Sequence, residues 1–280
     1  LGGDTTLEQC LKETNEIGFS GIEAGGKFPK NSNELIPKLE KENLKLCSGW
    51  YGANLLKNTV KEEILVMKDQ LDLFKECNAP CMVVAEVSGS IQGEVKIPLS
   101  KRPILNMDEW KTFYNKISEI SKYMEDTGVP LAYHHHMGTV VQSQEDTERL
   151  IDNTSDTVKL LIDTGHMMFA GGDFVKIAKD YSSRLQHVHC KDIRKDVLDM
   201  SLKNDLSFID AFFAGAFTVP GDGCINYENF LKILKNFNYK GWLVVEAEQD
   251  PKKANPFEYG KIGFNHLKKI ALDCGFEITR

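Results

Sequence analysis

The sequence lacks the features that would place it in a membrane or on a nucleic acid. Its longest apolar stretch, AFFAGAFTVP at 211–220, is much shorter than the ~20 apolar residues of a transmembrane helix. The first residues do not form the charged and apolar regions of a signal peptide. Basic residues are interspersed with acids and the net charge is −7, so no basic stripe is available for nucleic acid. We therefore expect no membrane partner and no nucleic-acid partner.

Paired cysteines and low-complexity linkers are also absent. The seven cysteines are spread singly and no CxxC motif occurs, a pattern typical of reduced thiols in a cytoplasmic protein. No change in composition divides the chain, so residues 1–280 are expected to form a single domain. The sequence starts with Leu1 rather than methionine, and we expect some of the native N-terminus to be missing.

Seven short β-rich runs are present, and amphipathic helical segments separate them. The segment before the third run has apolar residues spaced 3, 4 and 3 apart, which share one helical face: Ile64, Met67, Leu71 and Phe74. This alternation of strands and helices predicts a parallel sheet wrapped by helices. The predicted strands lie within residues 16–25, 43–51, 79–87, 129–136, 158–166, 185–192 and 241–249.

A closed barrel of the (β/α)₈ type needs one strand more than the seven predicted here. Because the chain opens with the helical segment TTLEQCLKETNEIG at 5–18, we predict an α/β fold of the (β/α)₈ TIM barrel class whose first strand is missing from the N-terminus. A gap should then lie beside the strand at 19–24. An open doubly wound sheet is the alternative, and the lack of a GxGxxG motif after the early strands disfavours it.

Polar residues concentrate at the carboxyl ends of the predicted strands, where a TIM barrel builds its active site. Side chains alternate along a strand, so His134 and His136 share one face and His135 takes the other. The same alternation groups the polar residues of two further strand ends: His187, His189 and Lys191 on one, Glu246 and Glu248 on the other.

Imidazole and carboxylate groups from four strand ends are the ligands that Mn²⁺, Co²⁺, Fe²⁺ or Zn²⁺ would take. Some of these residues have plainer roles as well. Asp163 in DTGH is placed to cap the following helix, and Glu246 or Glu248 could form a buried ion pair with Lys191 or Arg194. The candidate metal ligands are His134, Asp163, His189 and Glu246.

Several motifs occur in the order found in the xylose isomerase-like superfamily of TIM barrels, which the chain resembles: DTGH at 163–166, HVHCKD at 187–192, PGDG at 220–223 and GWLVVE at 241–246. Longer stretches resemble the inosose dehydratase family, namely GIEAGGKFP at 21–29, LAYHHHMGTVVQ at 131–142, HVHCKDIR at 187–194, FTVPGDG at 217–223 and EAEQDP at 246–251. The resemblance covers nearly the whole chain.

The resemblance to the superfamily implies a divalent metal held by Asp163, His189 and Glu246. The fourth position, usually a glutamate, is occupied by His134, which makes the site richer in nitrogen and one unit less negative. His134 could therefore contact substrate instead, and Glu248 is the alternative to Glu246. We expect Mn²⁺ or Co²⁺, with Fe²⁺ or Zn²⁺ as alternatives, and the family resemblance adds glutathione as a further cofactor.

The family resemblance also implies the reaction. The substrate would be 2-keto-myo-inositol (scyllo-inosose), which a hydro-lyase converts to a trihydroxycyclohexane-1,2-dione by α-proton abstraction through a metal-stabilised enediolate. The candidates for proton transfer are His136, Lys191 and Glu248. The candidates for substrate contacts are Glu23, Trp50, His166 and Arg194.

Other functions remain open at this stage. A metal-dependent sugar or keto-polyol isomerase or epimerase would use a similar site, although it would favour glutamate at position 134. An endonuclease IV-like DNA repair enzyme fits poorly with a net charge of −7. A sugar-binding module without activity would not need inward-facing ligands. The long segment at 202–223 should form a short helix rich in phenylalanine, either as a lid over the barrel or as an interface in a homo-oligomer.

Overall fold

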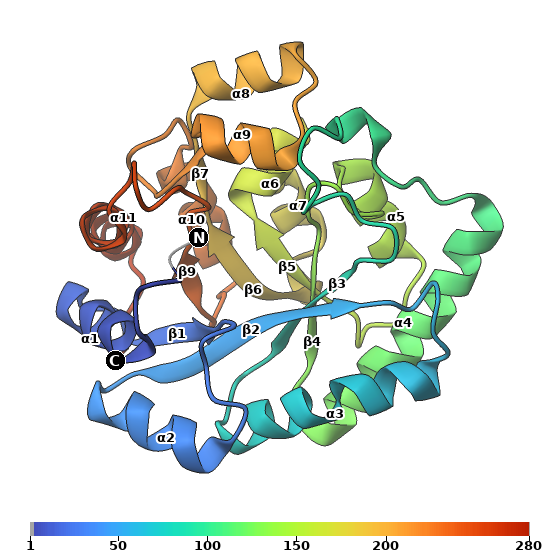
Figure 1. Ribbon diagram of the computed structural model, residues 1–280, viewed down its shortest axis with the longest axis horizontal. Helices are drawn as coiled ribbons and strands as arrows, with labels where there is room; N and C mark the ends of the chain where they lie inside the picture. Colours follow the sequence, from blue (N-terminus) through green and yellow to red (C-terminus); the bar gives the residue numbers. More distant parts are fainter. Residues whose placement is uncertain (1–2, 280) are drawn as a thin grey trace.

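The computed structural model describes residues 3–279 and has one parallel sheet that curls into a barrel, with helices around its outside (Figure 1). The sheet has seven strands in the order β1-β2-β3-β4-β5-β6-β9, and every neighbouring pair is parallel. The strands are β1 (Gly21–Ala24), β2 (Lys45–Ala53), β3 (Met82–Glu86), β4 (Leu131–His134), β5 (Lys159–Asp163), β6 (Leu185–Cys190) and β9 (Leu243–Val245).

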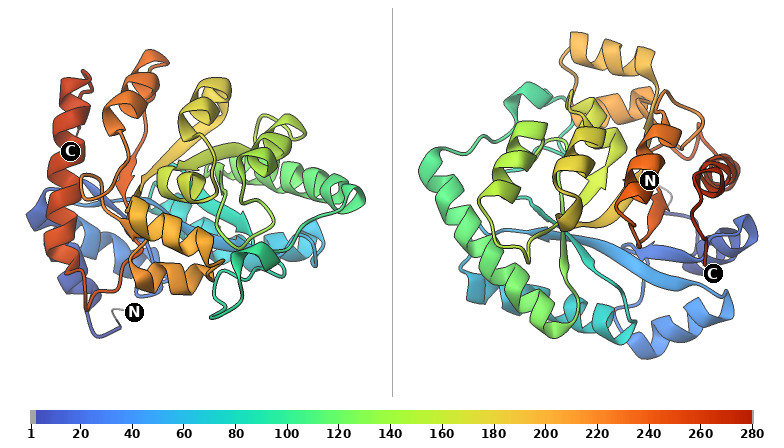
Figure 2. Two further views of the ribbon diagram at one scale, coloured as in Figure 1. Left: turned by 90° about the horizontal axis from the view of Figure 1, so that it is seen from above. Right: turned by 180° about the vertical axis from the view of Figure 1, so that it is seen from behind.

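Helices connect the strands and cover the outer face of the barrel, as both views of Figure 2 show. The helices of this outer layer are α1 (Leu7–Ile17), α2 (Ser32–Lys41), α3 (Val60–Glu76), α4 (Met107–Thr127), α5 (Gln144–Asp152), α7 (Phe174–Asp180), α10 (Tyr227–Asn236) and α11 (Pro256–Asp273). Short 3₁₀ turns lie at Leu99–Lys101 and Ser182–Arg184.

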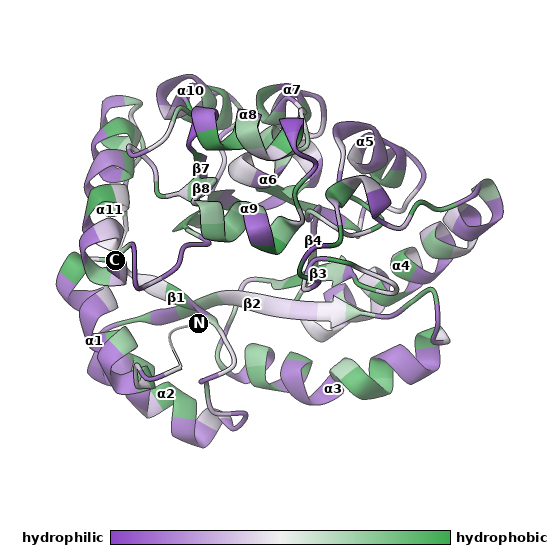
Figure 3. Cartoon of the chain, turned by 45° about the horizontal axis from the view of Figure 1, so that its top comes forward, coloured by the Kyte–Doolittle hydropathy of each residue, from purple (hydrophilic) through white to green (hydrophobic). Residues whose placement is uncertain are grey.

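Local sequence explains where these helices begin. Thr59 and Glu62 form a capping box at the start of α3, because the Thr59 hydroxyl accepts from the Glu62 amide and the Glu62 carboxylate accepts from the Thr59 amide. Asn106 and Glu109 do the same for α4. Figure 3 shows hydrophilic and hydrophobic residues alternating along outer helices such as α3 and α11. One face of each helix can therefore pack on the sheet while the other meets water.

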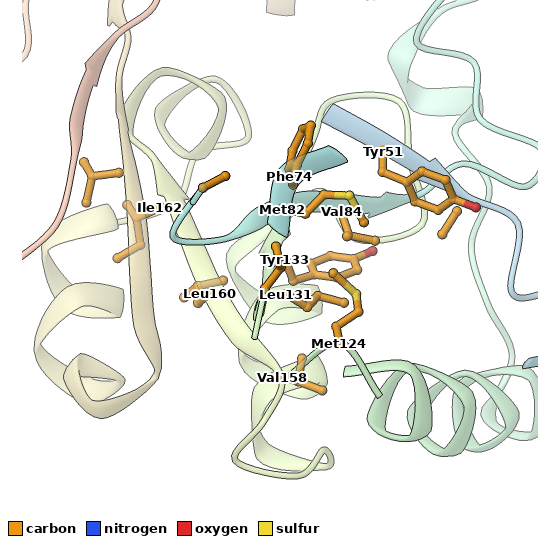
Figure 4. Close-up of a cluster of buried hydrophobic side chains, with 14 of the residues drawn as sticks. Tyr51, Phe74, Met82, Val84, Met124, Leu131, Tyr133, Val158, Leu160 and Ile162 are labelled. Carbon is orange, nitrogen blue, oxygen red and sulfur yellow. The ribbon is translucent and has the colours of Figure 1, made fainter. Parts of the chain in front are cut away.

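The main core lies between the sheet and the helices (Figure 4). Met82 and Val84 of β3 pack there with Tyr133 of β4, Leu160 of β5 and Phe74 of α3, and all five are buried. Alternate residues of the same strands face the barrel interior instead. Val83, Ala132 and Leu161 form a small separate cluster with Cys81. Two residues after Ala132 and Leu161, the same strands end in His134 and Asp163.

The sheet does not close between β1 and β9. A cavity of about 910 Å³ lies along this gap and is lined by residues of both strands and by aromatic side chains that include Phe19, Trp242 and Phe264. The predicted gap beside the strand at 19–24 is therefore present, and the predicted TIM barrel class is confirmed. No helix within residues 3–279 is both long enough and apolar enough to cross a membrane.

The segment between β6 and β9 forms an excursion at one end of the barrel. It contains β7 (Asp192–Ile193), α8 (Lys195–Lys203), α9 (Phe208–Ala214) and β8 (Phe217–Thr218), and β7 pairs with β8 in antiparallel orientation. The predicted short phenylalanine-rich helix is α9. Phe208 and Phe217 pack in a second cluster with Met137 and with Phe169, which lies in α6 (Thr164–Phe169). The excursion thus covers the ends of β4 and β5, and we call it the cap (residues 192–218).

Candidate metal and substrate site

Four side chains converge inside the barrel at the carboxyl ends of its strands. His134 ends β4, Asp163 ends β5, His189 lies near the end of β6, and Glu246 directly follows β9. One donor atom from each lies within 4.8 Å of the donor atoms of the other three. The structure therefore brings together the four residues that the sequence put forward as metal ligands.

The ring of His134 is oriented by the backbone of the next residue. Its Nδ1 lies 2.6 Å from the carbonyl oxygen of His135. Because a carbonyl oxygen can only accept, Nδ1 carries the proton and Nε2 keeps a lone pair. This Nε2 faces the centre of the cluster, 3.6 Å from Oδ2 of Asp163. His134 can therefore act as a ligand through Nε2.

Three atoms of the cluster are buried without a hydrogen-bond partner: Oδ2 of Asp163, Nδ1 of His189 and Oε2 of Glu246. Nδ1 of His189 lies 2.9 Å from Oε2 of Glu246 and 3.6 Å from Oδ2 of Asp163. A buried polar atom without a partner costs roughly 1–3 kcal/mol. One cation among these atoms would satisfy all three, so the residues present fit a divalent metal.

The pKa values reflect the same concentration of charge. Burial alone would lower the pKa of His189, but the carboxylates of Glu23 and Glu246 raise it well above its ordinary value. Burial would raise the pKa of Asp163, but Lys191 and His166 hold it well below the ordinary value. Without a cation, a proton on His189 takes the position that a metal would compete for.

Lys191 is fully buried beside the cluster. Its Nζ lies 2.8 Å from Oε2 of Glu248, 3.1 Å from Oε2 of Glu246 and 3.4 Å from Oδ2 of Asp163. Burial would lower its pKa, but these three carboxylates together raise it above the ordinary value. Lys191 is therefore an ammonium ion. The buried ion pair that the sequence suggested for Glu246 and Glu248 is present with Lys191.

Another group of titratable side chains lies next to Lys191 and consists of His136, His166 and Glu248. The rings of His136 and His166 lie 4.0 Å apart, and their Nε2 atoms are 3.8 Å and 3.3 Å from the Glu248 carboxylate. Nδ1 of His136 donates to the carbonyl oxygen of Met137 at 2.9 Å, which leaves the Nε2 lone pair toward Glu248. Burial, with His136 and Lys191 nearby, lowers the pKa of His166, so this ring is neutral.

His135 lies on the opposite side of β4 from its two neighbours. It is buried, and its Nε2 accepts a hydrogen bond of 3.2 Å from the backbone amide of Asp163. Burial, with the neighbouring His134, lowers its pKa to about 3. His135 therefore has a structural role, because it ties the end of β4 to the end of β5.

A cavity of about 380 Å³ opens above the cluster. Trp50 forms one wall, and its ring lies edge-on to His134 and His136 at centroid distances of 5.6 and 5.4 Å. Phe208 of the cap forms another wall. His166 and Lys191 do not line this cavity, but both contact Glu248, which does. The lining residues are Glu23, Trp50, Val83, Gln92, His134, His136, His189, Phe208, Glu246 and Glu248.

Gln92 is a lining residue that the sequence did not indicate. It comes from the loop after β3, and its Oε1 is buried without a hydrogen-bond partner. The loop is docked on the HHHMGT segment, since the Ile91 amide donates to the carbonyl oxygen of Gly138 at 2.9 Å. A Cβ on residue 138 would lie 2.8 Å from the backbone nitrogen of Gln92, so only glycine permits this close approach of the two segments. No motif around Gln92 could have revealed the contact.

Arg194 does not line the cavity. Its guanidinium donates to the carbonyl oxygen of Gly215 at 2.8 Å, to Oγ1 of Thr218 at 3.0 Å and to Oδ2 of Asp222 at 2.6 Å. These partners all belong to the end of the cap and the turn that follows it. The expectation that Arg194 contacts substrate does not match this geometry, because its donors are already used to hold the cap.

The parallel barrel and the polar cluster at the carboxyl ends of its strands define a class of TIM barrel. The model of the family described as xylose isomerase-like TIM barrel matches residues 11–270. The chain belongs to this family. The resemblance that the strand-end motifs indicated is therefore confirmed.

Two relatives are similar to this chain over most of its length. The chain is 44% identical over 261 residues to inosose dehydratase 2 of a Bacillus cereus strain, with 92% of this chain and 88% of that protein covered. It is 43% identical over 279 residues to the rhizopine catabolism protein MocC of Rhizobium meliloti, with 100% and 86% covered. Its similarity to the inosose dehydratase family is confirmed at this level, and a dehydratase of that name is a hydro-lyase.

Solved structures support the fold alone, because their sequences are distant. The probable 3-DHS dehydratase AsbF of Bacillus anthracis aligns with a TM-score of 0.69 at 14% identity, covering 94% of this chain and 93% of that one. The IolI protein, whose structure holds a zinc atom, aligns with a TM-score of 0.66 at 18% identity, covering 96% and 93%.

Proposed function

We propose that this chain is a metal-dependent dehydratase that removes water from 2-keto-myo-inositol and yields a trihydroxycyclohexane-1,2-dione. The observation that carries the proposal is the convergence of ligand atoms from His134, Asp163, His189 and Glu246. Among them, Oδ2 of Asp163, Nδ1 of His189 and Oε2 of Glu246 are buried without a hydrogen-bond partner. The choice of substrate rests on the relatives named inosose dehydratase, which match this chain over 92% of its length.

A divalent cation would be held by His134, Asp163, His189 and Glu246, and Mn²⁺ or Co²⁺ suits these two imidazoles and two carboxylates. When bound, it would act as a Lewis acid on the ketone oxygen of the substrate. The two carboxylates of the set balance the charge of a divalent ion. Lys191 adds a positive charge on the Glu248 side, so substrate oxygens would be drawn to that side of the site.

Proton transfer would use Glu248 and the side chains that contact it. His136 is best placed to take the proton from the carbon next to the ketone, since its Nε2 lone pair lies at the cavity and its Nδ1 proton is held by Met137. The hydroxyl on the following carbon leaves as water after it gains a proton, which the buried ammonium of Lys191 would supply by way of Glu248, because Glu248 lines the cavity and Lys191 does not. Glu248 contacts both groups and can return the proton from His136 to Lys191.

Substrate binding uses the walls of the cavity. Trp50 and Phe208 present aromatic surfaces that exclude water, and the Gln92 amide offers a donor and an acceptor for ring hydroxyls. His166 packs against Phe208 and is neutral, so its contribution is to orient Lys191, whose Nζ is 2.9 Å from its Nε2. Glutathione dependence and a homo-oligomeric state are further expectations that activity and mass measurements on the purified protein would check.

The test is a reconstituted assay. Protein stripped with a chelator is incubated with 2-keto-myo-inositol alone, with Mn²⁺ and with Co²⁺, and the dione is followed by its ultraviolet absorbance. We expect product only with metal. Sugar epimerisation and isomerisation are measured in parallel, because a site of this composition could also serve those reactions. Epimerised sugar without dione would contradict the proposal, and so would full dehydration by metal-free protein.

A further inference from the structure

Glu23 makes a contact that its sequence position does not suggest. It lies in β1, at a point where the pairing register with β2 shifts between Ile22 and Glu23. Its carboxylate reaches across the barrel interior to β6, a strand that does not pair with β1. Oε1 is 2.9 Å from Nε2 of His187, and the carboxylate is 3.1 Å from Nε2 of His189.

We propose that Glu23 is a positioning residue for the metal site: it holds His189 through Nε2 so that Nδ1 is presented to the cation. This inference rests on the proposed metal dependence. It gives Glu23 a role other than the substrate contact that the sequence suggested. The same carboxylate also contacts Nε2 of His187, which does not line the cavity, and this second contact fixes the position of Glu23.

The direction of the hydrogen bonds supports the proposal. An ionised carboxylate only accepts, so both histidines donate their Nε2 protons to Glu23. Nδ1 is therefore the nitrogen left for a second partner, and Nδ1 of His187 and of His189 are both buried without a hydrogen-bond partner. For His189 this nitrogen points at the carboxylates of Asp163 and Glu246. Between these carboxylates Nδ1 needs a positive charge, which either a proton on Nδ1 or a cation that replaces it can supply.

A metal-binding histidine commonly donates its other N–H to a carboxylate, which fixes the ring and raises the basicity of the ligand nitrogen. Loss of such a partner typically costs ~10–100-fold in metal affinity. A substrate contact would behave differently, since its loss would raise KM and leave metal affinity unchanged. A space-filling role would affect stability alone. The three roles can therefore be separated by measurement.

The experiment measures Co²⁺ and Mn²⁺ affinity by calorimetry for the wild type, E23Q and E23D. E23Q keeps the shape but turns an NH₂ group toward one histidine, so we expect its Kd for both ions to rise ~10–100-fold. E23D keeps the charge on a shorter side chain, and its Kd should lie between those of the wild type and E23Q. The visible spectrum of bound Co²⁺ should also change in E23Q. Nitrogen-15 shifts of the metal-free wild type should show a proton on Nε2 of both His187 and His189.

The matched control is E63Q. Glu63 is a buried carboxylate that accepts from the Tyr51 hydroxyl and the Asn58 amide, outside the cavity. E63Q should lose stability but keep the wild-type Kd. Equal Kd values for the wild type, E23Q and E23D would overturn the role of Glu23, as would a higher KM in E23Q at unchanged Kd. Absence of cation binding by the wild type would instead overturn the proposed function. If E23Q does not fold, the Kd of E23D and the nitrogen-15 shifts of the wild type test the role of Glu23.

Discussion

Asp163 uses its two carboxylate oxygens for different purposes. Oδ1 accepts from the backbone amide of His166 at 2.8 Å and so caps α6, while Oδ2 lies among the candidate ligands without a hydrogen-bond partner. Both interpretations that the sequence offered for this residue, the helix cap and the ligand, therefore apply to the same side chain. A conservative substitution can separate them.

Asp163→Asn keeps an oxygen for the cap and removes the negative charge. We expect Mn²⁺ affinity to fall by more than the ~10–100-fold that loss of a supporting residue causes, together with dehydratase activity. Far-ultraviolet circular dichroism should stay close to wild type. Asp173→Asn is the control, because Asp173 caps α7 in the same way and does not touch the cluster. If Asp163→Asn bound Mn²⁺ as tightly as the wild type, Asp163 would not be a metal ligand.

The cap is the element whose role the sequence left most open. Its phenylalanine-rich helix α9 brings Phe208 to the cavity, which favours the lid over the oligomer interface for this face of the helix. Arg194 holds the end of the cap through Gly215, Thr218 and Asp222. One guanidinium outside the cavity therefore helps to hold the cap in place.

Arg194→Ala removes several hydrogen bonds to the end of the cap and should cost about 1–3 kcal/mol of stability. Because the barrel is unchanged, we expect metal affinity to remain at the wild-type value while KM rises. Limited proteolysis should cut within the cap sooner than in the wild type. Arg149→Ala serves as control, since its pair with Glu145 is an exposed contact on α5 worth little. Unchanged KM and proteolysis would mean that the cap is held by packing alone.

At the scale of the whole molecule, cation binding should be linked to stability. The cluster keeps several carboxylates and imidazoles buried together, and a ligand that binds only the folded state stabilises it by mass action. At a free concentration of 100 times Kd the gain is ~2.7 kcal/mol. For a chain of this size that corresponds to a rise in Tm of about 5 °C.

The measurement is a thermal melt of chelator-treated protein with increasing Mn²⁺ or Co²⁺. Tm should rise with the logarithm of metal concentration above Kd in the wild type and stay flat in Asp163→Asn. A rise of equal size in both proteins would place the stabilising ion elsewhere on the chain.

Much of this architecture follows from local patterns in the chain. The spacing of apolar residues predicted the helices and strands, because each period reflects the geometry of a single element. Strand alternation grouped His134 with His136, His187 with His189, and Glu246 with Glu248 for the same reason. The gap beside β1 followed from counting the strands that the chain provides.

Only the tertiary structure decided what each of these side chains contacts. Glu23 and His187 are 164 residues apart and meet because the barrel curls β1 toward β6. The same closure brings Gln92 to the cavity, directs Arg194 to the cap and leaves Nδ1 of His189 without a partner. Local periodicity fixes which face of a strand a residue takes, whereas hydrogen-bond partners depend on distances between elements that the sequence places far apart.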